Sequence, residues 1–182
     1  TERTKNDLIF VNHAMPITKA EVDQKLELLA SLIAKETSNK EIKNKNQVKD
    51  AYILAKVNHI TDRTLIEKLY EASTAGIQID LLVRGNCSLV TGIPGVSENI
   101  HINGIIDRYL EHSRIFIFSN GGEEKYYIGS ADWMPRNLDN RIEVLVPVYN
   151  KEIQADLKQI IYYDLQDTVK GHIVDGSGEN LP

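Results

Sequence analysis

The stretch AYILAKVNHITDRTLIEKLYEASTAGIQIDLLVRG, residues 51–85, decides the fold class. Its first apolar run, at 51–57, predicts a buried strand, and Asp62 stands where a helix N-cap is expected. The apolar residues of that helix recur at helical spacing: Leu65, Ile66, Leu69 and Tyr70. A second apolar run, at 77–83, predicts another buried strand, which ends at Arg84. A strand, a helix and a strand in this order are typical of an α/β protein.

The segments on either side of this unit continue the alternation of strands and helices. The other expected elements, in chain order, are a short strand at 8–11, a helix that begins at Thr18, a helix at 105–110, a hairpin with strands at 114–118 and 126–128, a strand at 142–148 and a helix at 152–169. Residues 35–50 read as an exposed connection and residues 171–182 as a flexible tail. We therefore expect an α/β sandwich, a mixed β-sheet flanked by helices, folded as a single domain over residues 1–182.

Composition excludes several classes of protein. The 182 residues are 42% hydrophobic and 26% charged, which is too apolar for a disordered chain. No apolar run approaches the roughly 20 residues that span a bilayer, and the first ten residues lack the apolar core of a signal peptide. Cys87 is the only cysteine, so no disulfide framework or cysteine-based zinc site is expected within this chain. These features predict a soluble, cytoplasmic protein.

The charge pattern bears on possible ligands. The net charge is −5, which argues against non-specific binding of nucleic acid. Five of the seven arginines nevertheless fall between residues 84 and 141, and arginine is the side chain that contacts phosphate groups in a bidentate way. Any phosphate site in this segment must therefore be a local arrangement of cations.

Three features of this segment are candidates for chemistry. Arg84 directly follows a buried strand, where ligands gather in open α/β sheets, although a surface arginine at a strand end is an equally simple reading. His112, with Arg114 two residues on, has a side chain suited to acid/base work or to phosphate contact, although a lone histidine is often structural. The third feature is GSADWMPRNLDNR, residues 129–141, in which small residues follow a strand.

Within residues 129–141, Arg136 and Arg141 supply cations, and nearby polar residues are expected to fix them: Asp132, Asn137 and Asp139. Trp133 reads most simply as a core residue. The four remaining histidines show no metal-binding spacing, so we assign no metal ligand in this chain: His13, His59, His101 and His172.

Four stretches together resemble the C-terminal domain of bacterial polyphosphate kinase, the long-chain-synthesising type whose C-terminal half carries two phospholipase-D-like domains. They are KVNHITDRTLIEKLYEASTAGIQIDLLVRG (56–85), GIPGVSENI (92–100), RYLEHSRIFIF (108–118) and YIGSADWMPRNLDNRIEVLVPV (127–148). His112-x-Arg114 followed by GSAD also resembles the phospholipase-D pattern of His-x-Lys before a Gly-Ser-x-Asn segment, with Ser119 in place of the usual aspartate. Residues 1–50 match the family poorly.

The resemblance implies a phospholipase-D-like fold and a transferase that moves the terminal phosphate of ATP reversibly to polyphosphate. In the family, the histidine that becomes phosphorylated lies in a preceding domain, and the Mg²⁺ ligands lie there too, outside this chain. His112 matches the second active-site histidine, and Arg84 and Arg141 match phosphate-binding arginines. The implied partners are ATP, ADP, polyphosphate and the remaining domains of the same polypeptide.

The resemblance further implies a homo-oligomer when the enzyme is full length, located in the cytoplasm with peripheral attachment to the inner membrane as an option. As a fragment, this chain is expected to be inactive alone. Two other readings stay open at this point. One is a phosphodiesterase-like member of the same superfamily, which would need two His-x-Lys motifs where this chain has one imperfect copy. The other is a non-catalytic module that binds polyanions or serves assembly.

Overall fold

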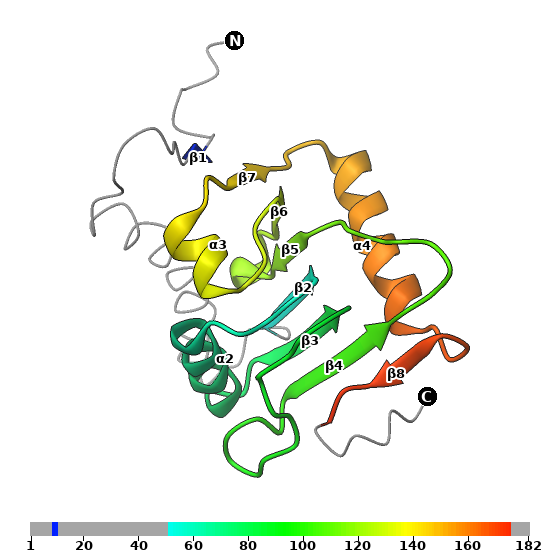
Figure 1. Cartoon of the computed structure of the whole chain (residues 1–182). Helices are drawn as coiled ribbons and strands as arrows, with labels where there is room; N and C mark the ends of the chain where they lie inside the picture. The colour runs from blue at the N-terminus through cyan, green and yellow to red at the C-terminus, as the bar shows by residue number, and fades with distance from the viewer. Residues whose placement is uncertain (1–8, 11–50, 176–182) are drawn as a thin grey trace.

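The computed structural model describes residues 9–10 and 51–175. Its strands are β1 (Ile9–Phe10), β2 (Tyr52–Val57), β3 (Gln78–Val83), β4 (Ile100–Ile105), β5 (Ile115–Phe118), β6 (Lys125–Gly129), β7 (Val144–Pro147) and β8 (Gly171–Ile173). Its helices are α2 (Arg63–Thr74), α3 (Pro135–Asn140) and α4 (Lys151–Leu165), with a short 3₁₀ turn, η1, at Asn120–Gly122 (Figure 1).

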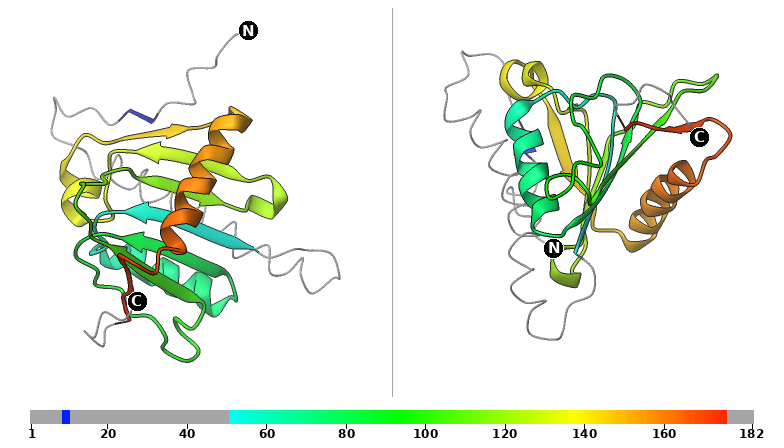
Figure 2. Two further views of the ribbon diagram at one scale, coloured as in Figure 1. Left: turned by 90° about the vertical axis from the view of Figure 1, so that its right-hand side faces the viewer. Right: turned by 90° about the horizontal axis from the view of Figure 1, so that it is seen from below.

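The strands form one mixed sheet in the order β1-β7-β6-β5-β2-β3-β4-β8. The pairs β2–β3 and β3–β4 are parallel, and every other neighbouring pair is antiparallel. Helices α2 and α4 cover opposite faces of this sheet (Figure 2). The predicted α/β architecture, a mixed sheet flanked by helices, is confirmed.

The central strands are buried on both faces, which explains their nearly continuous apolar runs. Because side chains alternate along a strand, Ile53 of β2 joins the larger core cluster with Leu69 of α2. Leu54, the next residue, joins the smaller cluster with Ile161 of α4. As predicted, Asp62 caps α2: its side chain accepts a hydrogen bond of 2.8 Å from the backbone N–H of Leu65.

The helix predicted at 105–110 is wrong. The structure has strand β4 at Ile100–Ile105 and no regular secondary structure from residue 106 to residue 114. Ile100 and Ile102 are buried while His101 is exposed, so β4 follows the alternation of a strand. The apolar residues that suggested a helix face no core: Ile106, Tyr109 and Leu110 are all exposed.

The C-terminal segment is more ordered than expected at its start. The flexible tail predicted at 171–182 begins later, because Gly171–Ile173 forms β8 and pairs antiparallel with β4. Opposite His172 stands Gly104, where a Cβ would lie 2.5 Å from His172 Nε2, so a residue without a side chain allows this pairing. The helix predicted at 152–169 is confirmed, although it ends at Leu165.

The remaining predicted elements divide into two groups. The strand at 8–11 is confirmed in β1, the hairpin at 114–128 in β5 and β6, and the strand at 142–148 in β7. The helix from Thr18 and the connection at 35–50 lie outside the described residues.

Helix α4 is fastened to the sheet by charged side chains as well as by apolar contacts. Lys56 of β2 forms an ion pair with Asp164, and Lys158 forms one with Glu124, which also accepts a hydrogen bond from the hydroxyl of Tyr52. Burial alone would raise the pKa of Glu124, but the hydrogen bonds from Lys158, Tyr126 and Tyr52 outweigh it and lower this pKa from 4.5 to about 2. Burial and the Glu124 carboxylate raise the pKa of Tyr52 to about 12.

We expect Glu124→Gln to lower the free energy of unfolding at pH 7 by about 1 to 3 kcal/mol. Because the folded-state pKa of Glu124 is depressed, its contribution is present above pH 4.5 and is lost as the pH falls towards 2. The variant should therefore show a shallower loss of stability across that window in urea unfolding. The exposed neighbour Glu123 is the matched control, and equal pH profiles for Glu124→Gln and Glu123→Gln would contradict the assignment.

Candidate functional site

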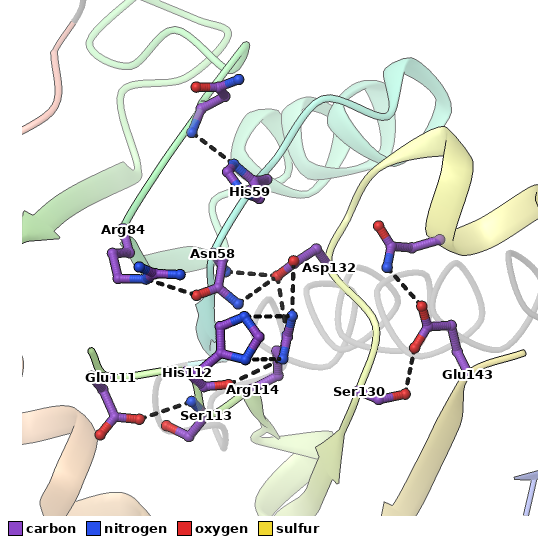
Figure 3. A network of polar contacts seen from close by, with 12 residues as sticks. Asn58, His59, Arg84, Glu111, His112, Ser113, Arg114, Ser130, Asp132 and Glu143 are labelled. Atoms are coloured by element: carbon purple, nitrogen blue, oxygen red, sulfur yellow. Dashed lines mark hydrogen bonds and ion pairs between the residues drawn. The ribbon is translucent and has the colours of Figure 1, made fainter. Parts of the chain in front are cut away.

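The topology brings six strand ends to one edge of the sheet, which we call the carboxyl edge. The parallel strands β2, β3 and β4 end there, and the antiparallel pairings mean that β5 and β7 begin there and β6 ends there. Asn58, Arg84 and Arg114 are the residues next to three of these ends, and Asp132 lies three residues beyond the end of β6. Figure 3 shows the four side chains in one network. The ligand position expected of an open α/β sheet is therefore lined with polar side chains, two of which are arginines, the side chain suited to phosphate contact.

Asp132 lies at the centre of this network. Its Oδ1 accepts hydrogen bonds from the backbone N–H of Asn58 (2.7 Å), from Asn58 Nδ2 (3.0 Å) and from Arg114 Nε (3.2 Å). Its Oδ2 accepts one from Arg114 Nη2 at 3.0 Å. Burial alone would raise the pKa of Asp132, but the bonds from Arg114 and Asn58 lower it, so the carboxylate is ionised at neutral pH.

The ring of His112 lies beside the guanidinium of Arg114 (Figure 3). Arg114 Nη1 is 3.1 Å from His112 Nδ1, and Arg114 Nη2 is 3.3 Å from His112 Nε2. Arg114 Nη1 also donates to the backbone carbonyl of His112 at 3.1 Å. Arginine only donates, so the ring nitrogen of His112 that accepts from it carries no proton, and the tautomer decides which of the two nitrogens that is. The imidazole itself is exposed, within reach of a ligand.

Among the described residues, the side chain of Arg84 is held by a hydrogen bond from only one of its three nitrogens. Its Nε donates to Asn58 Oδ1 at 2.9 Å, and within residues 51–175 no other hydrogen bond or ion pair of its side chain is present. The two terminal nitrogens therefore remain for a ligand, in the fork that matches two phosphate oxygens. The side chain is half-buried, which lowers the competition from water.

The backbone around Arg84 is joined to the loop after β2. Gly85 N donates to the carbonyl of Asn58 at 2.7 Å, and Asn86 N donates to His59 Nδ1 at 2.9 Å. A Cβ on Gly85 would lie 2.4 Å from Cε1 of the His59 ring, so glycine is needed for the ring to rest against this backbone. These contacts leave Arg84 little freedom to move.

Two polar residues of the segment 129–141 do not make the contacts with Arg136 and Arg141 that the sequence predicts. Asp132 pairs with Arg114 and not with Arg136 or Arg141, and Asn137 Nδ2 donates to Glu143 Oε1 at 2.6 Å. These two polar residues therefore do not fix the local arginines, because each finds a partner brought close by the sheet.

Trp133 belongs to the core, as its simplest reading predicted. It is 1% exposed, and its ring stacks on Phe116 with the centroids 5.6 Å apart. This packing sets the position of the preceding residue, Asp132.

Arg141 lies at the same edge, although none of the contacts above involves it. It follows α3 as its C-cap, is exposed, and stands three residues before the first residue of β7. The topology thus brings Arg84, His112 and Arg141 to the carboxyl edge, and the hydrogen-bond network joins the first two.

Sequence reasoning missed two residues of this region. Asn58 follows β2 just as Arg84 follows β3, so the same signal, a polar residue at a strand's carboxyl end, was present. Glu143 precedes β7, is 8% exposed, and accepts hydrogen bonds from Ser130 Oγ and Asn137. A buried carboxylate with neutral partners has no sequence signature, because its partners come from other segments.

A cavity of about 240 Å³ opens beside Arg84. Its charged lining residues are Lys56, Arg84, Asp107, Glu111, Asp164 and Asp167. Four carboxylates against two cations make the cavity unfavourable for an anion, so a phosphate would approach Arg84 from the side of His112.

Within residues 51–175, no group of three or more His, Cys, Asp or Glu side chains is arranged to hold a metal ion. Over the same residues, no helix has the length and apolar character needed to cross a membrane.

Comparison with known proteins adds independent findings. The family model for polyphosphate kinase C-terminal domain 2 matches residues 22–182. The polyphosphate kinase of Pseudomonas aeruginosa is 52% identical over 133 residues, which is 72% of this chain and 19% of that protein. The crystal structure of polyphosphate kinase from Porphyromonas gingivalis superposes with a TM-score of 0.82 and 39% identity, covering 96% of this chain and 24% of that one.

A more distant likeness concerns the fold alone. Nuc from Salmonella typhimurium, a phospholipase D family member, superposes with a TM-score of 0.55 at 12% identity, over 81% of this chain and 88% of that one. The predicted phospholipase-D-like fold is confirmed. The chain spans about a fifth of the length of the curated relatives it matches.

Removal of Asp132 tests the central ion pair. Asp132→Ala leaves the Arg114 guanidinium, whose side chain is 11% exposed, without its carboxylate, and we expect the free energy of unfolding to fall by about 3 kcal/mol or more. Urea unfolding followed by circular dichroism measures this loss. Glu67→Ala, which breaks the exposed Arg63–Glu67 pair, should change stability little, and a similar small change for Asp132→Ala would contradict the assignment.

Proposed function

Because the chain belongs to the polyphosphate kinase family, we propose that it forms one side of the active site of a polyphosphate kinase. The proposed reaction is the reversible transfer of the terminal phosphate of ATP to polyphosphate, through a phosphohistidine that lies outside this chain. The observation that supports this function is the network at the carboxyl edge, in which Arg84 and His112 are linked through Asn58, Asp132 and Arg114. The domain assignment, one domain over residues 1–182, is part of the same proposal.

Phosphoryl transfer requires positioning and neutralisation of charge more than covalent chemistry by the protein. In the proposed complex, the two terminal nitrogens of Arg84 bind two oxygens of one phosphate group of the nucleotide. The protonated ring nitrogen of His112 donates to an oxygen of the transferring phosphoryl group. Arg141 contacts a further phosphate from its place before β7, on the same edge.

The proposed transfer has two balanced steps. In the first, a nitrogen of the external histidine attacks the terminal phosphorus of ATP, a P–N bond forms, and the P–O bond to ADP breaks. In the second, a terminal oxygen of polyphosphate attacks the same phosphorus, and the P–N bond breaks. In both steps His112 keeps its proton close to the oxygens that carry the charge, and Arg84 holds their orientation.

We assign Mg²⁺ to ligands outside this chain. The carboxylates described at the carboxyl edge are engaged with cations or hydrogen-bond donors, as Asp132 is with Arg114, and no step is assigned to the metal through them. The ion would supply charge neutralisation on the ATP phosphates. The other proposed partners are the remaining domains of the polypeptide and further copies of it, in the cytoplasm, with peripheral attachment to the inner membrane as an option.

The two rival functions receive less support. A phosphodiesterase would need a second His-x-Lys motif, and its usual aspartate is replaced by Ser119, which is buried and accepts a hydrogen bond from Tyr52 N at 3.2 Å. A non-catalytic polyanion-binding module would not need the exposed His112 to be oriented by a buried ion pair. The mutational tests below distinguish the kinase from the binding module.

The chain of residues 1–182 alone should show no ATP-dependent synthesis of polyphosphate, because phosphate-positioning residues do not replace a nucleophile. The measurement is polyphosphate formation by the purified chain, with the complete enzyme as positive control. Synthesis by the chain that persists after His112→Ala would overturn the placement of the nucleophile outside it.

In the complete enzyme, His112→Ala should lower turnover by about 100- to 1,000-fold, the range for a lost hydrogen-bond donor to the charge of the transition state. The thermal midpoint should change little, because His112 is exposed. His101→Ala is the matched control, since His101 is exposed on β4 and its ring bonds to Gln78 and Asp80. A stable His112→Ala enzyme with unchanged turnover would leave the chain as a binding module.

A further inference from the structure

Arg84 and Arg114 lie on the same edge, but their partners differ in chemistry. Arg114 is paired with a carboxylate, that of Asp132, at 3.0 Å. Arg84 is held by a neutral amide oxygen, Oδ1 of Asn58, at 2.9 Å. The ion pair with Asp132 offsets the charge of the Arg114 guanidinium. The amide of Asn58 fixes the Arg84 guanidinium without offsetting its charge.

We propose that Asn58 is a positioning residue that orients Arg84 for phosphate while leaving its positive charge for the ligand. This inference rests on the proposed function and concerns the same site. Asn58 does not touch the phosphate, and it acts through the guanidinium of Arg84.

The orientation of Asn58 is fixed by its own partners. Its Nδ2 must face a carboxylate, Asp132 Oδ1, and its Oδ1 must face a donor, Arg84 Nε, so the two ends of the amide cannot be exchanged. Its backbone N–H donates to Asp132 and its backbone carbonyl accepts from Gly85 N. The residue is 2% exposed, so no water competes for these bonds.

Neither an aspartate nor an apolar residue fits both partners. An aspartate would keep the acceptor for Arg84, but it would bring two carboxylates to about the 3.0 Å that now separates Asn58 Nδ2 from Asp132 Oδ1. It would also offset the charge of Arg84. An apolar residue would leave Arg84 Nε without its acceptor and remove one donor from Asp132.

The arrangement also links the two halves of the site. Asn58 touches Arg84 on one side and Asp132 on the other, and Asp132 holds Arg114, which contacts His112. The amide contacts Arg84 directly and reaches His112 only through Asp132, which keeps its two bonds from Arg114 when the amide is removed. A phosphate that contacts both residues would meet a prearranged pair.

The test is a double-mutant cycle in the complete enzyme, with kcat and KM for ATP measured for Asn58→Ala, Arg84→Ala and the double variant. Asn58→Ala should lower kcat/KM roughly 10- to 100-fold, the range for a lost hydrogen bond to a charged group. In the Arg84→Ala background the same change should cost less than about threefold, because the group it positions is gone. Asn58→Asp should raise KM for ATP, because it offsets the charge of Arg84.

Two controls separate positioning from loss of folding. Asn99→Ala removes another amide, one that lies away from the site and donates a 2.9 Å hydrogen bond to the Ser73 carbonyl. This variant should alter the thermal midpoint without altering kcat/KM. Asn58→Ser is the milder variant if Asn58→Ala does not fold: its hydroxyl is too short to reach Arg84, and its cost should also vanish in the Arg84→Ala background.

The outcomes are distinct. If Arg84→Ala leaves kcat/KM unchanged, the proposed function of this site fails, and the role of Asn58 fails with it. If Arg84→Ala is damaging but the Asn58 substitutions cost the same in both backgrounds, the positioning role is overturned while the proposed function stands. Loss of the Asn58 effect in the Arg84→Ala background supports the inference.

Discussion

A buried carboxylate must be saturated with hydrogen bonds, and at Asp132 this requirement organises the whole carboxyl edge. Four hydrogen bonds reach its two oxygens, two from Asn58 and two from Arg114. They come from the end of β2 and from the residue that precedes β5, while Asp132 itself follows β6. Any shift of one strand end relative to the others would leave a buried charge with an unsatisfied oxygen, which is strongly unfavourable.

The two faces of the sheet are stabilised in different ways. The face under α2 carries the larger apolar cluster, which includes Trp133. Because Trp133 directly follows Asp132, the packing of this cluster helps to hold the polar network in place. The face under α4 has a smaller apolar cluster and adds the ion pairs Lys56–Asp164 and Lys158–Glu124. Helix α4 therefore depends on the ionisation of its partners, whereas α2 depends on apolar burial, which does not vary with pH.

Local patterns predicted most of the fold. The unit at 51–85 was predicted correctly because its signals are local: apolar runs, a capping residue and helical spacing. Strand β4 was missed although Ile100 and Ile102 alternate with His101 and Asn103, because the apolar residues at 105–110 favoured a helix that would begin where β4 ends. The site was predicted in part, since Arg84 and His112 follow local rules, but the partners of Asp132 lie 18 and 74 residues away.

Carboxylates offset much of the positive charge at the carboxyl edge. Arg114 is offset by Asp132, and the cavity beside Arg84 has more carboxylates than cations. Of the two arginines in the network, Arg84 is therefore the one whose own partner, an amide, does not offset its positive charge. In the proposed function, Arg84 and Arg141 each contact one phosphate of a chain that carries negative charge on every unit, so they neutralise only a short length of it. The proposed function therefore assigns further cations, like the phosphorylated histidine, to the remaining domains of the polypeptide, and the described edge is one side of the proposed site.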